Sequence, residues 1–205
     1  ASDVYKRQIV DLIRRLKDES FEIGLHGSLN SYNALGPLRT EKEKVEEVLG
    51  EPVIGGRQHY LKWKTPITWR LLERVGIKYD TTLGFADYEG FRSGICYPYE
   101  PFDILENRVL DIWEVPLIVM EGTLFGYRGL SPEDGLKRVQ RMVETVEQYR
   151  GVLAVLWHHS SFYELENPGT SEAYELILNY ITDKNAVCGP VRDILRIWCR
   201  VARLQ

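Results

Sequence analysis

The chain has 205 residues, of which 44% are hydrophobic and 27% are charged, a composition typical of an ordinary globular domain. Lys and Arg number 26 against 30 Asp and Glu, which leaves a formal charge of −4. That balance disfavours binding to a nucleic-acid backbone or to an anionic membrane surface. We therefore expect one globular domain with no nucleic-acid partner.

Hydrophobic runs and cysteines narrow the class further. The longest apolar run, residues 152–157, is far shorter than the ~20 residues of a membrane-spanning helix, so we expect no membrane span in this segment. Cys96, Cys188 and Cys199 form no C-x-x-C pair, which favours reduced, buried thiols over disulfides or a zinc ribbon. The compartment stays open, with the cytoplasm favoured by the lack of a signal pattern.

The first residues suggest a foreign origin. Residues 3–8, Asp-Val-Tyr-Lys-Arg-Gln, can be encoded by the transposase end of a common shotgun-sequencing adapter. We therefore interpret residues 1–8 as adapter-derived, as in a metagenomic fragment, and residues 9–205 as a native domain that is incomplete at its N-terminus.

Hydrophobic periodicity and capping signals predict the elements. In chain order they are helix 9–18, strand 21–25, helix 40–49, strand 53–57, helix 65–76, strand 77–82, strand 110–120 interrupted at Pro116, helix 131–150, strand 152–157, helix 171–182, strand 186–188 and helix 191–203. Thr40 and Glu43 have the spacing of a capping box, and Ser131-Pro132 opens the longest helix. A long loop, 83–101, separates two strands.

Strands that alternate with helices call for a parallel sheet, either open or closed into a barrel. The sequence contains neither G-x-G-x-x-G nor a P-loop, so a nucleotide-binding version of such a sheet is disfavoured.

All four histidines follow predicted strands. His26, His59, His158 and His159 stand at carboxyl ends, where parallel α/β folds place their ligand sites. Charged residues of the same edge are Arg57, Asp80 and Glu114. Histidines that converge with carboxylates suggest either a divalent metal site or acid–base catalysis, and the pattern alone does not choose between them.

Four short motifs then resemble a known family. The segments are Glu22-Ile-Gly-Leu-His-Gly-Ser28, Arg57-Gln-His-Tyr60, Tyr79-Asp-Thr-Thr-Leu83 and Leu156-Trp-His158. In their order and spacing they resemble the motifs of the polysaccharide deacetylases, the carbohydrate esterases with NodB homology. The resemblance covers most of the chain.

That resemblance implies a fold and an activity. The fold would be a distorted, TIM-like (β/α) barrel of about seven units that lacks its first strand. The activity would be metal-dependent removal of acetyl groups from N-acetylated sugars of a polysaccharide or glycan precursor. A divalent metal polarises the unreactive amide, with zinc expected foremost and cobalt or manganese as alternatives.

The resemblance also implies roles for single residues. His26 and Asn30 would be metal ligands. The catalytic residues would be His158 as general acid, Arg57 orienting the base and Asp80 tuning the acid. The substrate-binding residues would be His59, Tyr60, whose amide would help hold the oxyanion, Trp157 and Glu114.

Three departures from the family pattern leave alternatives open. Asn30 stands where the family has a second histidine, and His59 replaces a proline. The paired aspartates of the first family motif are absent before Ile9, so we expect them upstream and expect this fragment to be inactive. A second hypothesis is a non-catalytic, carbohydrate-binding relative without a metal, and a third is an unrelated metal-dependent hydrolase on a parallel barrel.

Overall fold

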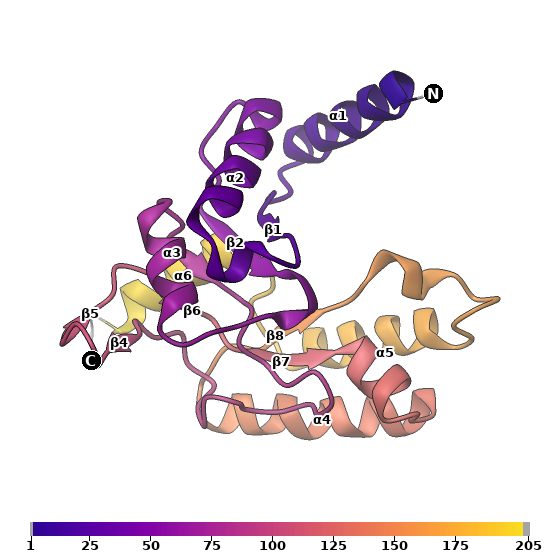
Figure 1. Ribbon diagram of the computed structural model, residues 1–205. Coiled ribbons are helices and arrows are strands. Elements are labelled where there is room, and N and C mark those ends of the chain that lie inside the picture. Colours follow the sequence, from indigo (N-terminus) through magenta and orange to yellow (C-terminus); the bar gives the residue numbers. More distant parts are fainter. Residues whose placement is uncertain (1, 203–205) are drawn as a thin grey trace. The chain divides into compact units, whose positions relative to one another are not determined.

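The computed structural model describes residues 2–202, with side chains described for residues 7–201. Residue 1 and the side chains of 2–6, which belong to the adapter-like segment 1–8, lie outside this part. The helices are α1 (Ser2–Asp18), α2 (Leu35–Leu49), α3 (Ile67–Arg74), α4 (Pro132–Gln148), α5 (Thr170–Asp183) and α6 (Val191–Ala202). Figure 1 labels them along the chain. Among residues 2–202, no helix is long and apolar enough to cross a membrane.

The strands are short. They are β1 (Leu25–Gly27), β2 (Gly55–Gln58), β3 (Tyr79–Asp80), β4 (Phe102–Asp103), β5 (Arg108–Val109), β6 (Trp113–Glu114), β7 (Leu117–Met120) and β8 (Ala154–Leu156). Single helical turns connect several of them: η1 (Ser31–Asn33), η2 (His59–Leu61), the π-helical η3 (Gly122–Tyr127) and η4 (His159–Phe162).

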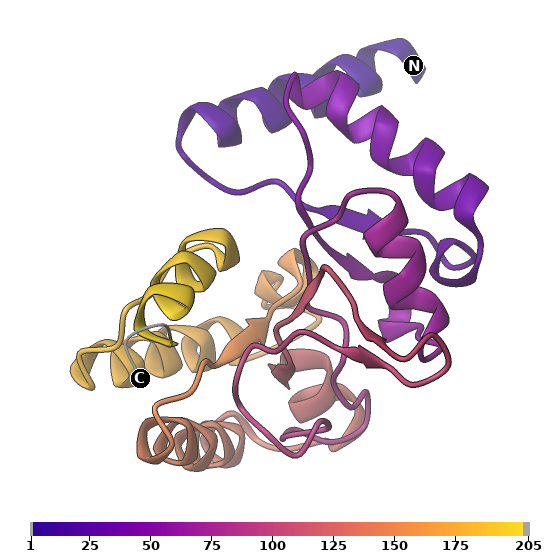
Figure 2. The ribbon, with the colours of Figure 1, turned by 90° about the vertical axis from the view of Figure 1, so that its left-hand side faces the viewer.

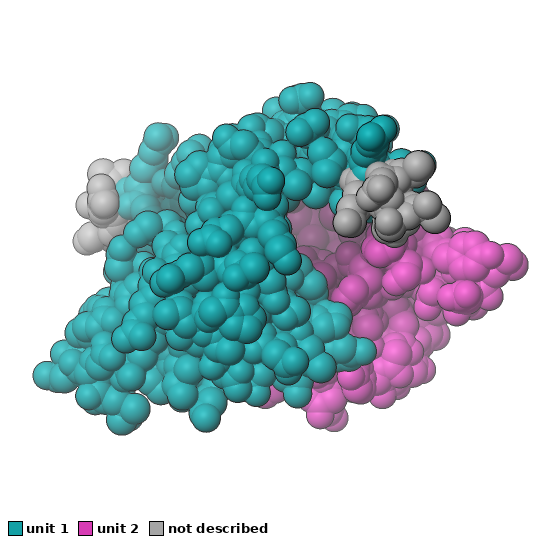
Figure 3. Space-filling model, turned by 45° about the horizontal axis from the view of Figure 1, so that its top comes forward, with its two compact units in different colours: residues 1–80, 100–113, 189–205 teal, residues 81–99, 114–188 magenta. Residues whose placement is uncertain are grey.

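The chain divides into two compact units, each assembled from separate stretches of sequence (Figure 3). Unit 1 comprises residues 1–80, 100–113 and 189–205, and unit 2 comprises residues 81–99 and 114–188. Each unit has its own sheet and its own buried side chains, so each is described by itself.

Unit 1 is built on parallel strands. β1 pairs with β2 and β2 with β3, and β6 follows β3 in the same sheet, where the Trp113 N–H donates to the Lys78 carbonyl at 2.8 Å. α1 lies beside α2 in this unit (Figure 2). The largest fully buried apolar side chains of the unit are Leu38, Val53, Leu72, Ile77, Leu110 and Ile112.

Unit 2 is built on the parallel pair β7–β8, with Met120 opposite Leu156. Helices α4 and α5 pack side by side, as both ribbon views show (Figures 1 and 2). Its core comprises Cys96, Ile118, Val119, Leu124, Val139, Val143, Val146 and Ile177. The four valines and isoleucines of α4 and α5 recur at helical spacing, which explains why this part of the sequence predicts its helices well.

Helix α4 confirms its prediction in detail. The Ser131 hydroxyl accepts the N–H of Asp134 at 3.2 Å, Pro132 occupies the first turn, and Glu133 and Asp134 follow where the helix dipole favours acids. The strand predicted over 110–120 is also interrupted at Pro116, which separates β6 from β7.

Other predicted boundaries were wrong. Helix α2 begins at Leu35 rather than at the capping box of Thr40, because Pro37 lies in its first turn, where a missing N–H costs nothing. The C-terminal end is confirmed, with Gly50 in the left-handed conformation at φ 72°. Residues 186–188 form no strand, and the antiparallel hairpin β4–β5 was not predicted.

Two broader expectations also need correction or stay open. The cysteines are free, but only Cys96 is buried, whereas Cys188 is exposed. Of the barrel, the structure bears out a mixed α/β fold with parallel strands. The strands of residues 2–202 form three sheets of four, two and two strands, none closed on itself, so closure is not confirmed.

Candidate functional site

Two histidines of unit 1 come together at the carboxyl ends of β1 and β2. His26 lies in β1 opposite Arg57, and His59 follows the last residue of β2. The His26 Nε2 and His59 Nδ1 atoms are 3.1 Å apart, and the two rings meet edge to face at 82°. The sequence prediction that histidines gather at this edge is therefore confirmed for this pair.

Close backbone packing holds the two strands at that edge. A Cβ on Gly27 would lie 2.2 Å from Oε1 of the buried Gln58 side chain, and a Cβ on Gly55 would lie 1.9 Å from the ring of Tyr79. Both glycines are therefore required by space, not by an unusual dihedral angle. They allow the neighbouring strands and the Tyr79 ring to approach closely behind the histidine pair.

The chain turns sharply after His59. Tyr60 and Leu61 both have positive φ, at 54° and 51°, a conformation that side chains other than glycine rarely adopt. Tyr60 is 71% exposed, and its ring contacts that of His59. This strained turn presents the Tyr60 side chain to solvent and packs its ring against one member of the histidine pair.

The remaining predicted residues of unit 1 differ in burial. Asp80 is wholly buried in β3, opposite Gly56, whereas Arg57 is half-buried and Asn30 is exposed just before η1. The Tyr79 hydroxyl beside Asp80 donates to Glu22, and burial together with that carboxylate raises the pKa of Tyr79. Asn30 makes no side-chain cap for η1, so its part in a metal site stays a prediction.

In unit 2, a histidine meets a carboxylate instead. His158 follows β8 and Glu121 directly follows β7, so both stand at the carboxyl ends of paired parallel strands. His158 Nδ1 is 2.5 Å from Glu121 Oε1, and the Ser161 hydroxyl donates to the same oxygen at 2.9 Å. The Glu121 side chain is almost wholly buried, whereas that of His158 is half exposed.

This arrangement fixes the orientation of the imidazole. A carboxylate that accepts from Nδ1–H leaves Nε2 as the nitrogen that can give or take a proton. The Ser161 hydroxyl holds the carboxylate in place. A half-exposed histidine held by a buried carboxylate is the arrangement expected of a general acid or base.

Glu121 was missed by the sequence prediction, which assigned Asp80 as the partner of His158. A usable signal was present, because strand 110–120 and strand 152–157 end directly before Glu121 and His158. Side chains at the ends of neighbouring parallel strands lie close together, but the order of strands in the sheet is not readable from one sequence. The tuning role of Asp80 stays a prediction.

The other predicted residues of unit 2 are packed into its interior. Glu114 is wholly buried, and its Oε1 accepts the N–H of Leu83 at 3.1 Å, which anchors the start of the long loop. The Trp157 ring packs between Phe125 and Tyr174, at centroid distances of 5.9 and 5.1 Å. His159 is exposed in η4. Substrate contacts of Glu114 and Trp157 stay predictions.

Comparison with solved structures gives a match to the fold. The chain is similar to a crystal structure of a "putative polysaccharide deacetylase" from Mycobacterium smegmatis, with a TM-score of 0.69 and 20% sequence identity. The match covers 97% of this chain and 70% of the other. No protein-family model and no curated protein sequence matches the chain. The likeness thus extends over nearly the whole chain at the level of the fold.

Proposed function

We propose that the protein is a metal-dependent hydrolase that removes acetyl groups from N-acetylated sugars. The observation that carries the proposal is the His158–Glu121 pair at the ends of β7 and β8, within a fold shared with the mycobacterial protein. Hydrolysis of an acetamide needs a proton donor for the departing amine, and a half-exposed histidine oriented by a buried carboxylate can supply it.

In this mechanism, His158 is the general acid and Glu121 its positioning residue. Glu121 accepts from Nδ1, so Nε2 carries the proton that the amine nitrogen takes as the carbon–nitrogen bond breaks. Arg57 orients the catalytic base, the amide of Tyr60 donates to the developing oxyanion, and Asp80 supports the acid. These three roles rest on the motifs of the sequence.

The chemistry of His26 and His59 fits a divalent metal. Two imidazole nitrogens bound to a tetrahedral zinc ion at about 2.0–2.1 Å lie about 3.3 Å apart, close to the 3.1 Å between Nε2 and Nδ1 here. A bound zinc would act as a Lewis acid on the amide carbonyl. His59 thereby takes the place that the motif comparison gives to Asn30, whose amide is the weaker donor.

Two histidines are an incomplete ligand set. Among the described residues, no group of three or more His, Cys, Asp or Glu side chains could hold a metal ion. We propose that the paired aspartates of the family's first motif complete the set and supply the base, from sequence that precedes Ile9 in the full reading frame.

The test is acetate release from an N-acetylglucosamine oligomer by the full reading frame, once it is recovered. We expect release by that chain and none by residues 9–205 alone. A full reading frame that binds the oligomer but releases no acetate, with or without added zinc, would contradict the hydrolase.

A second candidate function is carbohydrate binding without catalysis. It is favoured by Asn30, which stands where the family has a histidine. The two functions differ in the upstream sequence: a strand that ends in paired aspartates favours the hydrolase, and its absence favours the binding protein.

A further inference from the structure

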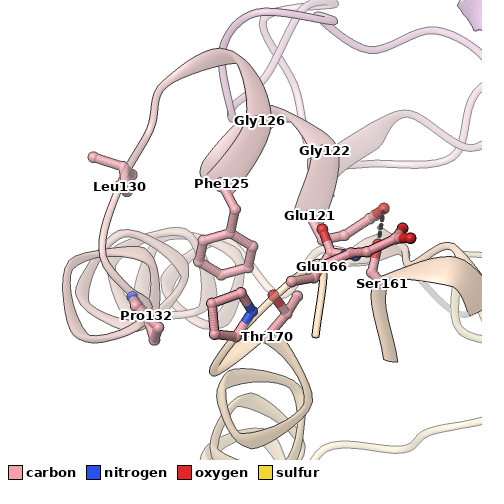
Figure 4. A pocket seen from close by; sticks show the side chains of 11 residues that line it. Glu121, Gly122, Phe125, Gly126, Leu130, Pro132, Ser161, Glu166 and Thr170 are labelled. Atoms are coloured by element: carbon pink, nitrogen blue, oxygen red, sulfur yellow. Dashed lines mark hydrogen bonds between the residues drawn. The ribbon is translucent and has the colours of Figure 1, made fainter. Parts of the chain in front are cut away.

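A cavity lies in unit 2 beside Glu121. It measures about 300 Å³, at the lower end of the range for small-molecule sites, and is bordered by η3, the first residues of α4 and α5 and the segment after η4. Figure 4 shows Glu121, Ser161 and Glu166 on one side and Phe125, Leu130 and Pro132 on the other. The cavity therefore has a polar wall and an apolar wall.

The polar wall contains a buried acceptor that nothing in the described chain satisfies. Glu121 is 3% exposed, and its Oε1 binds both His158 and Ser161. Its other oxygen, Oε2, is buried and has no hydrogen-bond partner among the described residues. Because an unsatisfied buried acceptor is costly, a donor supplied by a ligand would be favoured at this position.

The charge of the lining selects the kind of donor. Glu166 adds a second carboxylate to the lining, which contains no Lys, Arg or His. Asn167 contributes an amide, whose Nδ2 already donates to the Ser160 carbonyl at 3.2 Å. Two carboxylates without a basic neighbour in the lining favour a cation over a neutral donor.

The helix N-termini beside the cavity do not reverse this preference. Helix α4 begins with Ser131 accepting the N–H of Asp134, and the Gly169 N–H at the start of α5 donates to Glu164 at 3.0 Å. The bond from Gly169 holds the pKa of Glu164 below its usual range. An anion would have to compete with these acceptors of the chain itself.

The opposite wall fits a compact apolar body. Phe125, Leu130, Pro132 and Pro168 line it, and the Phe125 ring is held edge-on against Trp157. Apolar and aromatic side chains with a few placed polar groups are the usual composition of a small-molecule site. The volume admits a ring-sized ligand and no long polymer.

We propose that this cavity binds a small organic ammonium ion, with its charged nitrogen at Glu121 Oε2 and Glu166 and its ring-sized body against Phe125. The site does not depend on the proposed hydrolysis. A ligand there contacts the carboxylate that holds His158, so occupancy also reaches the orientation of that ring.

The test uses benzylammonium and the neutral, equally large benzyl alcohol, titrated calorimetrically into the 205-residue chain. We expect benzylammonium to bind at least about tenfold more tightly, a difference of roughly 1.4 kcal/mol. Glu121→Gln should lose that preference. Glu166→Gln, an exposed position that the fold tolerates, should weaken benzylammonium about two- to fivefold.

Glu175→Gln is the matched control, because this glutamate is exposed on α5 and does not line the cavity. It should leave the affinity for benzylammonium unchanged. Equal affinities for the two probes, or benzylammonium binding that neither Glu121→Gln nor Glu166→Gln weakens, would overturn the proposal. Tighter binding of inorganic phosphate than of benzylammonium, lost in Glu121→Gln, would also overturn it.

Discussion

His26 in unit 1 and His158 in unit 2 both stand at the carboxyl ends of short parallel strands, but their partners are of opposite kinds. His26 meets the ring of His59 across 3.1 Å, whereas His158 meets the buried carboxylate of Glu121 across 2.5 Å. Two neutral imidazoles in contact provide nitrogen donors to a cation. An imidazole on a carboxylate is instead held for transfer of a proton.

The comparison teaches that the partner, rather than the strand end, divides the work among histidines. The sequence places all four histidines at strand ends and thereby leaves metal binding and acid–base chemistry undecided. The partners decide, and they come from residues that are distant in sequence, 33 positions away for His59 and 37 for Glu121. Each prediction below changes one side of this comparison and leaves the other as a control.

The largest effect is expected from His158→Ala. Removal of a general acid lowers the rate about 10²- to 10⁴-fold, so acetate release by the full reading frame should fall by that factor. Zinc affinity should stay unchanged, because the metal-binding nitrogens belong to unit 1. A variant with full activity, or one that loses zinc together with activity, would break the division of roles.

Glu121→Gln should have a smaller effect on the same step. The amide keeps the size of the side chain but removes the negative charge that faces Nδ1, so kcat should fall about 10- to 100-fold, the range seen for groups that orient a functional histidine. KM should be unchanged, which separates a positioning role from loss of the fold. The exposed Glu175→Gln serves as the control and should match the unaltered chain in both constants.

The packing behind the His26–His59 pair can be broken at one glycine. Gly55→Ala would place a Cβ 1.9 Å from the Tyr79 ring, so the free energy of unfolding should fall by about 1–3 kcal/mol. Gly36→Ala in α2 meets nothing within 4 Å and should be neutral or stabilise by up to about 1 kcal/mol. Urea unfolding curves check both, and an unchanged midpoint for Gly55→Ala would contradict the close packing.

The smallest effect is a pH dependence that distinguishes the units. In unit 1, the Arg70 guanidinium, together with the amides of Leu105 and Glu106, holds the pKa of Asp103 below its usual range. A carboxyl whose pKa is lower in the folded state stabilises the fold above its unfolded pKa of about 3.9, and this contribution is lost as the pH falls.

Hydrogen exchange of α3 in unit 1 should therefore accelerate relative to α4 in unit 2 as the pH falls from about 5 to 3, once the intrinsic exchange rate is corrected. Asp103→Asn should flatten this difference. Equal acceleration of α3 and α4 in the unaltered chain would show that Asp103 does not set the acid stability of unit 1.

Sequence predicted those parts of the fold whose signals are local. The Ser131–Asp134 cap, the valine face of α4 and the left-handed Gly50 depend on neighbours within a turn or two, and the structure has them as expected. Strands were displaced by several residues, as for β1, which occupies Leu25–Gly27 rather than residues 21–25. Their extent depends on pairing with distant segments.

The candidate site divides along the same line. His26, His59 and His158 were readable from strand ends and short motifs, and the structure gives each a partner. Glu121 was not readable, because its role arises only where the order of β7 and β8 brings it to His158. Glu114, in contrast, carries an acidic side chain at a strand, but its carboxylate is used to hold the Leu83 amide.

The most direct test of the division between the two histidine sites is cobalt binding, followed by visible absorption of the 205-residue chain. The account predicts that His26→Ala and His59→Ala each weaken cobalt binding at least about tenfold, whereas His158→Ala binds as the unaltered chain does. Loss of binding in His158→Ala, or full binding in His59→Ala, would contradict it.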